Sequence, residues 1–186
     1  MNIKLVPGLN NSGPEHWQSI WEKKYGFERI NQEEWDYPVY NEWEKNFIEN
    51  LEKDNKCDTV LIAHSLGCLL TVKAMPKIRK YLKAVFLVAP PDPKEKQFPK
   101  FLASFEYLPE VRLEVPGMLV YSENDQYSSP MFCIQKGKQW GIETISVGRK
   151  GHINSESNID DWSEGFNLFH KLLEEVELNN KARMTT

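Results

Sequence analysis

Ser65, Asp125 and His152 offer a hydroxyl, a carboxylate and an imidazole in that chain order, each shortly after an apolar run. Serine alone is a poor nucleophile at neutral pH and needs a base beside it. Histidine can take the serine proton and later return it to a leaving group. A carboxylate fixes the imidazole tautomer and stabilises the imidazolium. If the fold brings them together, these residue types predict nucleophilic acyl transfer.

The segment that contains Ser65 is VLIAHSLGCLL, an apolar run that ends in AHSLG. It approximates G-x-S-x-G, the sharp strand-to-helix turn that presents a nucleophilic serine. The turn needs small residues two positions before and after the serine. Ala63 and Gly67 meet that need, although Ala63 replaces the usual glycine. The alternative interpretation of Ser65 is a helix N-cap, a position at which serine is also favoured.

The acid and the base are predicted in the next two loops. Asp125 lies in SENDQY after the apolar MLVY, and His152 lies in GRKGHIN after ETISV. A nucleophile, acid and base in this order, each after a strand, is the arrangement of α/β-hydrolases. Asp125 could instead be an ordinary turn residue. Asp92, in APPDP after an earlier strand, is the rival acid, while Glu123 is expected to point elsewhere.

The remaining histidines, and one cysteine near the serine, are expected to have structural rather than catalytic roles. We expect His64 to support the site from behind and His16 to border the pocket, while His170 should lie on the surface. Cys68 follows Ser65 within one helical turn and is predicted to be a small buried residue.

The first loop, PGLNNSGPEHW, is predicted to supply an oxyanion-hole amide. Its Gly8 and Gly13 have phosphate-loop spacing, but Pro-Glu follows where Lys-Ser/Thr is needed. In a hydrolase one donor comes from this loop and the other from the residue after the nucleophile. The predicted donors are therefore the backbone amide of Leu66 and one amide of the first loop, that of Leu9 or, as the second choice, that of Asn10.

Strand-like and helix-like segments alternate along the chain, which predicts an α/β three-layer sandwich with a mostly parallel sheet of about six strands. Ligands of such folds bind at the carboxyl ends of the strands. We expect one domain over residues 1–176 and a disordered tail over 177–186. The helix that starts at Leu66 should be interrupted near Pro76. The proline-rich segment 90–110 should be irregular.

Composition restricts the partners and the compartment. The chain has 186 residues and a formal net charge of −4, which argues against nucleic-acid and anionic-membrane binding. Three cysteines cannot all pair within the chain, so a reducing, cytoplasmic location is expected. No signal peptide or membrane-spanning run is recognised. A protein partner cannot be predicted from these features.

Over residues 4–172 the chain resembles small serine hydrolases of the α/β-hydrolase superfamily that are related to retinoblastoma-binding protein nine. The motifs that carry the resemblance are VPGLNNSGPEHW, WDYPVYNEW, LIAHSLGC, SENDQYSS and GHINSESNIDDWSEG. The resemblance implies a compact serine hydrolase without a large lid, with Ser65 as nucleophile, His152 as base and Asp125 as acid.

The expected activity is that of a carboxylesterase-like enzyme. It would cleave a small-molecule ester, or an amide, through an acyl-enzyme, with no metal or organic cofactor. The alternative is a non-catalytic protein-binding module on a hydrolase fold. Four aromatic residues of the irregular segment could either wall an acyl pocket or pack against the sheet edge: Phe98, Phe101, Phe105 and Tyr107.

Overall fold

The computed structural model describes residues 1–54 and 57–184. Its centre is one six-stranded parallel sheet in the order β2-β1-β3-β4-β5-β6. The strands are β1 (Asn2–Val6), β2 (Glu28–Arg29), β3 (Thr59–His64), β4 (Leu82–Val88), β5 (Gly117–Tyr121) and β6 (Glu143–Ser146). The helices are α1 (Trp17–Tyr25), α2 (Tyr40–Asp54), α3 (Leu66–Ile78), α4 (Pro130–Trp140) and α5 (Ser163–Met184). The described residues also contain three short 3-10 helices: η1 (Arg79–Tyr81), η2 (Lys100–Phe105) and η3 (Ser155–Ser157).

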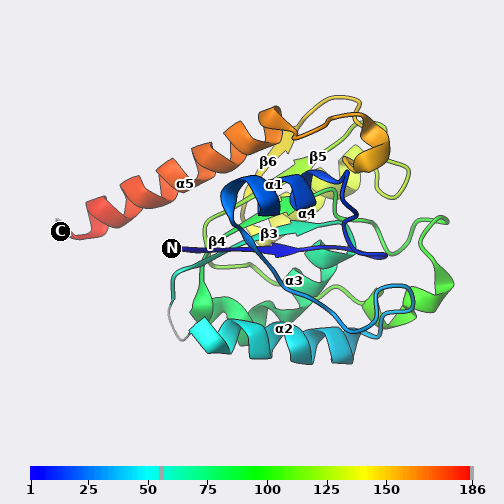
Figure 1. Cartoon of the computed structure of the whole chain (residues 1–186), viewed down its shortest axis with the longest axis horizontal. Coiled ribbons are helices and arrows are strands. Elements are labelled where there is room, and N and C mark those ends of the chain that lie inside the picture. Colours follow the sequence, from blue (N-terminus) through cyan, green and yellow to red (C-terminus); the bar gives the residue numbers. More distant parts are fainter. Residues whose placement is uncertain (55–56, 185–186) are drawn as a thin grey trace.

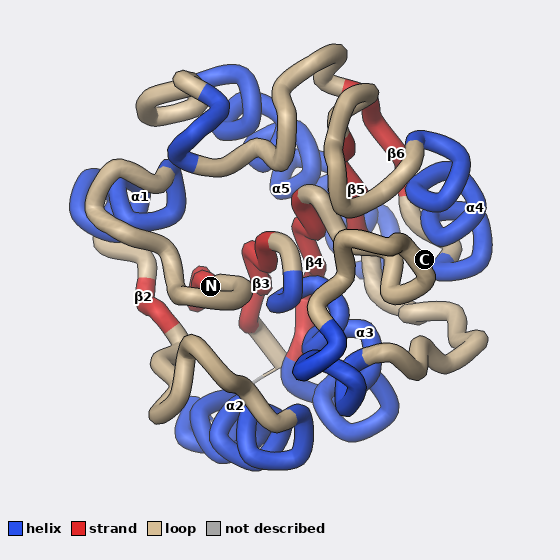
Figure 2. Tube along the Cα trace, turned by 90° about the vertical axis from the view of Figure 1, so that its right-hand side faces the viewer, coloured by secondary structure: helices blue, strands red, loops and turns tan. Residues whose placement is uncertain are grey.

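Helices cover both faces of the sheet, as the sequence predicted (Figure 1). Helices α1 and α5 bury Trp17, Trp21 and Phe169 against one face. Helices α2, α3 and α4 pack on the other face, as seen from the carboxyl ends of the strands in Figure 2. The central strands β3 and β4 are almost wholly buried, which explains their uninterrupted apolar sequences.

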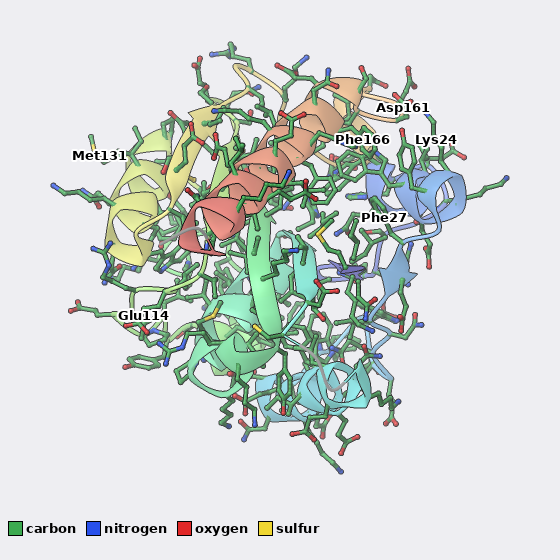
Figure 3. All side chains as sticks on the ribbon, turned by 90° about the vertical axis from the view of Figure 1, so that its left-hand side faces the viewer. Lys24, Phe27, Glu114, Met131, Asp161 and Phe166 are labelled. Atoms are coloured by element: carbon green, nitrogen blue, oxygen red, sulfur yellow. The ribbon has the colours of Figure 1, made fainter. Side chains whose placement is uncertain are left out.

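The seam between α1 and the start of α5 combines polar and aromatic contacts (Figure 3). The indole Nε1 of Trp21 donates to the carbonyl oxygen of Asp161 at 2.6 Å. The Asp161 carboxylate pairs with Lys24 at 2.9 Å. Tyr25 stacks on Phe166 with 4.1 Å between ring centroids. Because the ion pair is exposed, the aromatic contacts, above all those of the fully buried Trp21, contribute most of the stability of this seam.

The structure differs from the sequence-based prediction at two helix ends. Helix α3 passes through Pro76 without interruption and ends at Ile78. Pro76 is exposed and lies in the last turn, so the hydrogen bond that proline cannot make is lost only at the helix end.

Helix α5 continues to Met184, whereas the sequence predicted disorder from residue 177. The segment ELNNKARM contains mostly strong helix formers, which lets the helix propagate beyond the sheet. Residues 185–186 of the predicted tail lie outside the described residues. Within 1–54 and 57–184, none of the helices combines the length and apolarity needed to cross a bilayer.

The amino end of α3 crosses the end of β1 at very short range, at Gly67. A Cβ atom on Gly67 would overlap the carbonyl oxygen of Val6 and lie 2.7 Å from that of Pro7. Both neighbours are backbone atoms, one in the last residue of β1 and one just after it, and cannot move away as a flexible side chain could. Only glycine therefore fits where the helix leaves the turn.

We predict that Gly67→Ala lowers the free energy of unfolding by at least about 1–3 kcal/mol, because the methyl group would force the helix away from β1. Gly13→Ala is the matched control, since nothing lies within 4 Å of a Cβ atom there. Urea denaturation of both variants measures the difference. Equal stability of Gly67→Ala and the unmodified protein would contradict the close crossing.

Candidate active site

Ser65 occupies the sharp turn between β3 and α3, at the carboxyl edge of the sheet. Its backbone has φ 52° and ψ −124°, outside the regions that an L-residue prefers. The Ser65 amide donates to the Val88 carbonyl at 3.0 Å, which ties the turn to β4. The Ser65 side chain makes no capping hydrogen bond to α3. Ser65 therefore stands at the N-cap position without capping the helix through its side chain, and its hydroxyl is available to another partner.

That partner is His152, whose Nε2 lies 2.8 Å from the Ser65 Oγ. On the other side of the ring, Nδ1 lies 2.8 and 3.0 Å from the two carboxylate oxygens of Asp125. The Asp125 side chain is 1 % exposed and also accepts the Tyr127 amide at 2.9 Å. The structure thus brings the three predicted side chains into one hydrogen-bonded row, with the carboxylate on the Nδ1 side of the ring.

The rival acids lie elsewhere. Asp92 turns back on its own loop, where its carboxylate accepts the Lys94 amide at 2.9 Å. Glu123 accepts the Ser146 hydroxyl at 3.0 Å at the surface. Neither carboxylate has a hydrogen bond to His152 among the described residues, so only Asp125 has the predicted contact.

The loops that carry Asp125 and His152 are tied to each other by two polar side chains that the sequence analysis did not single out. The Ser122 hydroxyl accepts the Lys150 amide at 2.8 Å, and the Asn124 side chain accepts the Gly151 amide at 2.9 Å. Their position just after a strand could have marked Ser122 and Asn124 as candidates from the sequence. Their partners could not be predicted, because the two loops come together only in the folded chain.

His64 and His16 form a second layer behind the row. The His64 Nε2 donates to the carbonyl oxygen of His152 at 3.0 Å, so His64 supports the backbone of that residue. The His16 Nδ1 accepts the Gln18 amide and caps α1, and the ring meets His64 edge-on with 4.7 Å between centroids. The His16 Nε2 is buried and has no hydrogen-bond partner among the described residues.

Burial controls the ionisation of this second layer. Desolvation, with Arg29 nearby, lowers the pKa of His16 to about 3. Desolvation and the neighbouring His16 hold the pKa of His64 well below its ordinary value. Both imidazoles are therefore neutral at physiological pH. Burial also raises the pKa of the Cys68 thiol, which makes it a small packing residue rather than a second nucleophile, as predicted.

The structure corrects one of the three predicted oxyanion-hole donors. The Asn10 amide donates to the Trp35 carbonyl at 2.9 Å and is therefore not available to a ligand. The Leu66 amide belongs to the first turn of α3, where backbone amides have no intrahelical partner. A Cβ atom on Gly8 would lie 3.0 Å from the Leu66 nitrogen, so the first loop approaches this amide closely. Leu9 and Leu66 remain as candidates.

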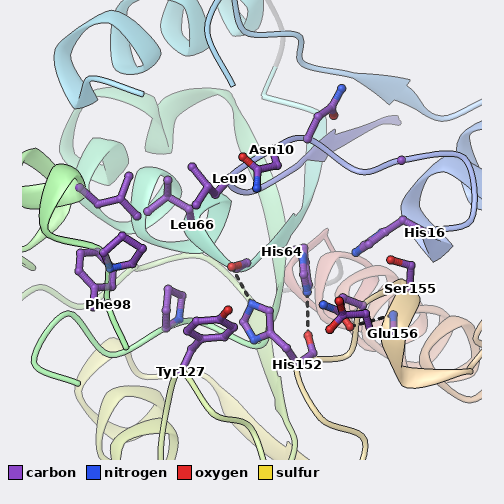
Figure 4. A pocket seen from close by; sticks show the side chains of 17 residues that line it. Leu9, Asn10, His16, His64, Leu66, Phe98, Tyr127, His152, Ser155 and Glu156 are labelled. Carbon is purple, nitrogen blue, oxygen red and sulfur yellow. Dashed lines mark hydrogen bonds between the residues drawn. The ribbon is translucent and has the colours of Figure 1, made fainter. Parts of the chain in front are cut away.

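A cavity of about 420 Å³ opens over Ser65 and His152 (Figure 4). The sequence analysis left open whether four aromatic residues line the pocket or pack against the sheet edge. Of these, Phe98 lines this cavity. Phe105 is fully buried in the core, and Phe101 and Tyr107 are 49 % and 73 % exposed. The irregular segment therefore contributes one wall residue of the four.

Comparisons with known proteins identify the family and the fold of the chain. The family described as Serine hydrolase matches residues 3–171. A YdeN-like hydrolase of Pectobacterium atrosepticum is 30 % identical, with a TM-score of 0.83 over 94 % of this chain and 91 % of that one. The ydeN product of B. subtilis is 18 % identical, with a TM-score of 0.78 over 93 % and 98 %.

More distant structures share the fold. Est1E of Butyrivibrio proteoclasticus is 12 % identical, with a TM-score of 0.67 over 95 % of this chain and 88 % of that chain. A comparison with the curated proteins gave no match. The narrower resemblance to relatives of retinoblastoma-binding protein nine stays a prediction. Because the family match covers nearly all of the sheet and its helices, the chain belongs to the Serine hydrolase family and has the α/β-hydrolase fold.

Proposed function

We propose that this protein is a carboxylesterase-like enzyme that cleaves a small ester, or an amide, through an acyl-enzyme. The observation that carries the proposal is the contact of 2.8 Å between the His152 Nε2 and the Ser65 Oγ. A hydroxyl beside an imidazole, itself oriented by a buried carboxylate, is the arrangement that activates serine.

In the proposed first half-reaction, the Ser65 Oγ attacks the substrate carbonyl carbon while His152 Nε2 takes the hydroxyl proton. The carbonyl oxygen becomes an oxyanion, which the amides of Leu9 and Leu66 stabilise. The intermediate then collapses, the bond to the leaving group breaks, and His152 donates the proton to the departing oxygen or nitrogen. An acyl ester on Ser65 and a free alcohol or amine result.

In the second half-reaction water replaces the alcohol. His152 takes a proton from water as the water oxygen attacks the acyl carbon, and it returns that proton to the Ser65 oxygen as the acyl bond breaks. Asp125 stays ionised throughout, keeps the proton on Nδ1 and stabilises the imidazolium in both steps. The carboxylic acid leaves and the free serine is restored.

Two further observations support the proposal. Structures with the same fold include Est1E and a thermophilic esterase from Thermogutta terrifontis, although identities of 12 % and 13 % show only the fold. Cys57, Cys68 and Cys133 are all free thiols, which agrees with the proposed cytoplasmic location.

Ser65→Ala should lose nearly all hydrolysis of p-nitrophenyl butyrate while it stays folded, because among the described residues that line the cavity only Ser65 has its hydroxyl against His152 Nε2. Turnover measured at 405 nm and labelling by a fluorophosphonate probe test this prediction. Equal turnover by the variant would remove Ser65 from the mechanism, whereas an unmodified protein that neither cleaves the ester nor takes the probe would favour a binding module.

Asp125→Asn should lower kcat by a factor on the order of 10⁴, the loss seen in a serine protease when the equivalent change favours the wrong tautomer. Asp92→Asn removes a carboxylate from a neighbouring loop and should change kcat little. Steady-state kinetics of the two variants compare the rival acids directly. A larger loss in Asp92→Asn would reassign the acid.

The neutral second layer predicts how stability depends on pH. His16 has a pKa of about 3 in the folded protein, against about 6.5 for an exposed histidine of the unfolded chain. Between these values the unfolded chain binds the proton and the folded protein does not. The free energy of unfolding should therefore fall as pH drops below about 6.5, by about 2 kcal/mol at pH 5 for His16.

His16→Asn should remove that loss while it retains a side-chain oxygen to cap α1. Guanidinium denaturation followed by circular dichroism at pH 7 and pH 5 measures the difference. His170→Asn, a change at an exposed histidine, is the control. If His16→Asn and the unmodified protein lost the same stability, His16 would accept a proton in the folded state and would become a rival base.

A further inference from the structure

The cavity has two sides of different chemistry, separated by the contact between Ser65 and His152. One side is apolar and is lined by Leu9, Leu66, Phe98, Pro99 and Leu102. The other is polar and is lined by His16, Asn154, Ser155 and Glu156. Figure 4 shows Phe98 and Leu66 on one side of the dashed contact and His16, Ser155 and Glu156 on the other.

Glu156 gives the polar side a negative charge. Among the described residues that line the cavity, it is the only Asp, Glu, Lys or Arg. The two neighbouring imidazoles of the second layer, His16 and His64, are neutral, so they do not compensate it. Arg149 and Lys150 line an adjacent surface pocket together with Glu156, and Lys150 pairs there with Glu164 at 3.9 Å. Within residues 1–54 and 57–184 no hydrogen bond or ion pair engages the Glu156 carboxylate itself. The charge is therefore available to a ligand.

The backbone of Glu156 is fixed by a capping box. The Asn154 side chain accepts the Glu156 amide at 3.1 Å, and the Ser157 hydroxyl accepts the Asn154 amide at 3.1 Å. This turn, η3, follows His152 after two residues. The carboxylate is thus carried by the same short loop as the proposed base.

The position of the base decides which part of a substrate meets each side. A leaving group must come within hydrogen-bond reach of the His152 Nε2, because it receives its proton there. The loop of His152 supplies Asn154, Ser155 and Glu156 to the polar side, so the polar side accepts the leaving group. The apolar side includes the side chains of Leu9 and Leu66, whose amides would hold the carbonyl oxygen, and it accepts the acyl chain.

We infer that the substrate is an ester or amide of a small apolar acid whose leaving group carries a positive charge, such as an amino alcohol or a diamine. This inference rests on the proposed hydrolase function. A single exposed carboxylate in water contributes modestly, so the expected preference for a cationic over a neutral leaving group is about twofold to fivefold in kcat/KM.

The test compares three butyrate esters with leaving groups of similar size: choline, 3,3-dimethylbutanol and 2-hydroxyethanesulfonate. Acid release is followed in a pH-stat at pH 7.5. The unmodified protein should prefer the choline ester over the neutral ester, and the neutral ester over the anionic one. The preference should shrink as sodium chloride rises from ~0.02 to ~0.5 M, since salt screens an exposed charge and leaves shape recognition unchanged.

Glu156→Gln should bring the ratio of kcat/KM for the choline and neutral esters close to one. Each ratio is taken within one protein, so a partial loss of active enzyme does not affect it. Glu49→Gln is the matched control, because it removes an exposed carboxylate on α2 away from the cavity, and it should keep the ratio of the unmodified protein.

The outcomes separate this inference from the proposed function. If p-nitrophenyl butyrate and all three esters resist hydrolysis, both fail. If the neutral ester is cleaved but the choline ester has no advantage, or if Glu156→Gln retains the advantage, the inference is overturned and the hydrolase proposal stands.

Discussion

The strained turn at Ser65 is the constraint on which the site depends. A φ of 52° with ψ −124° costs an L-residue about 1–3 kcal/mol, so the surrounding structure must hold it. Strand β3 enters the turn paired on both sides, with Ala63 opposite Val6 of β1 and Leu87 of β4. A shift of one residue in that register would turn every side chain of the strand to the other face. The buried sheet thus fixes where the hydroxyl emerges.

The backbone amides of the first loop must lie near this turn. Arg29, at the edge of the sheet, holds the loop in place through hydrogen bonds. One guanidinium nitrogen donates to the Asn11 side chain at 2.6 Å and to the Ser12 carbonyl at 2.9 Å, while another pairs with Glu22 at 2.6 Å. The Arg29 side chain is 8 % exposed, so its charge is partly desolvated and these bonds are stronger than surface contacts. The two residues of β2 thus place Arg29 against the first loop, while Glu28 pairs with Lys4 of β1 at 3.0 Å.

The sequence allowed the sheet, the two helical layers and the three aligned side chains to be predicted, because parallel strands end at one edge and loops that follow them must meet there. The prediction of the Asn10 amide as an oxyanion-hole donor was wrong, because its hydrogen-bond partner is a carbonyl that only the folded chain brings near. Helix α3 continues through Pro76 because this proline lies in the last turn. The sequence does not predict the end of the helix accurately enough to show that. The neutrality of His16 follows from burial, which spacing alone does not indicate.

The indole of Trp17 has a consequence for observing the loop that carries His152. Its Nε1 donates to the Ile153 carbonyl at 2.9 Å, and its ring lies 4.7 Å from Trp21 and 5.0 Å from Trp162. Three indoles at such separations share their excitation, so their ultraviolet absorption and emission depend on mutual orientation. Movement of the loop breaks the hydrogen bond of one member and reorients the group. The protein therefore carries an intrinsic optical reporter beside its proposed base, with no added label.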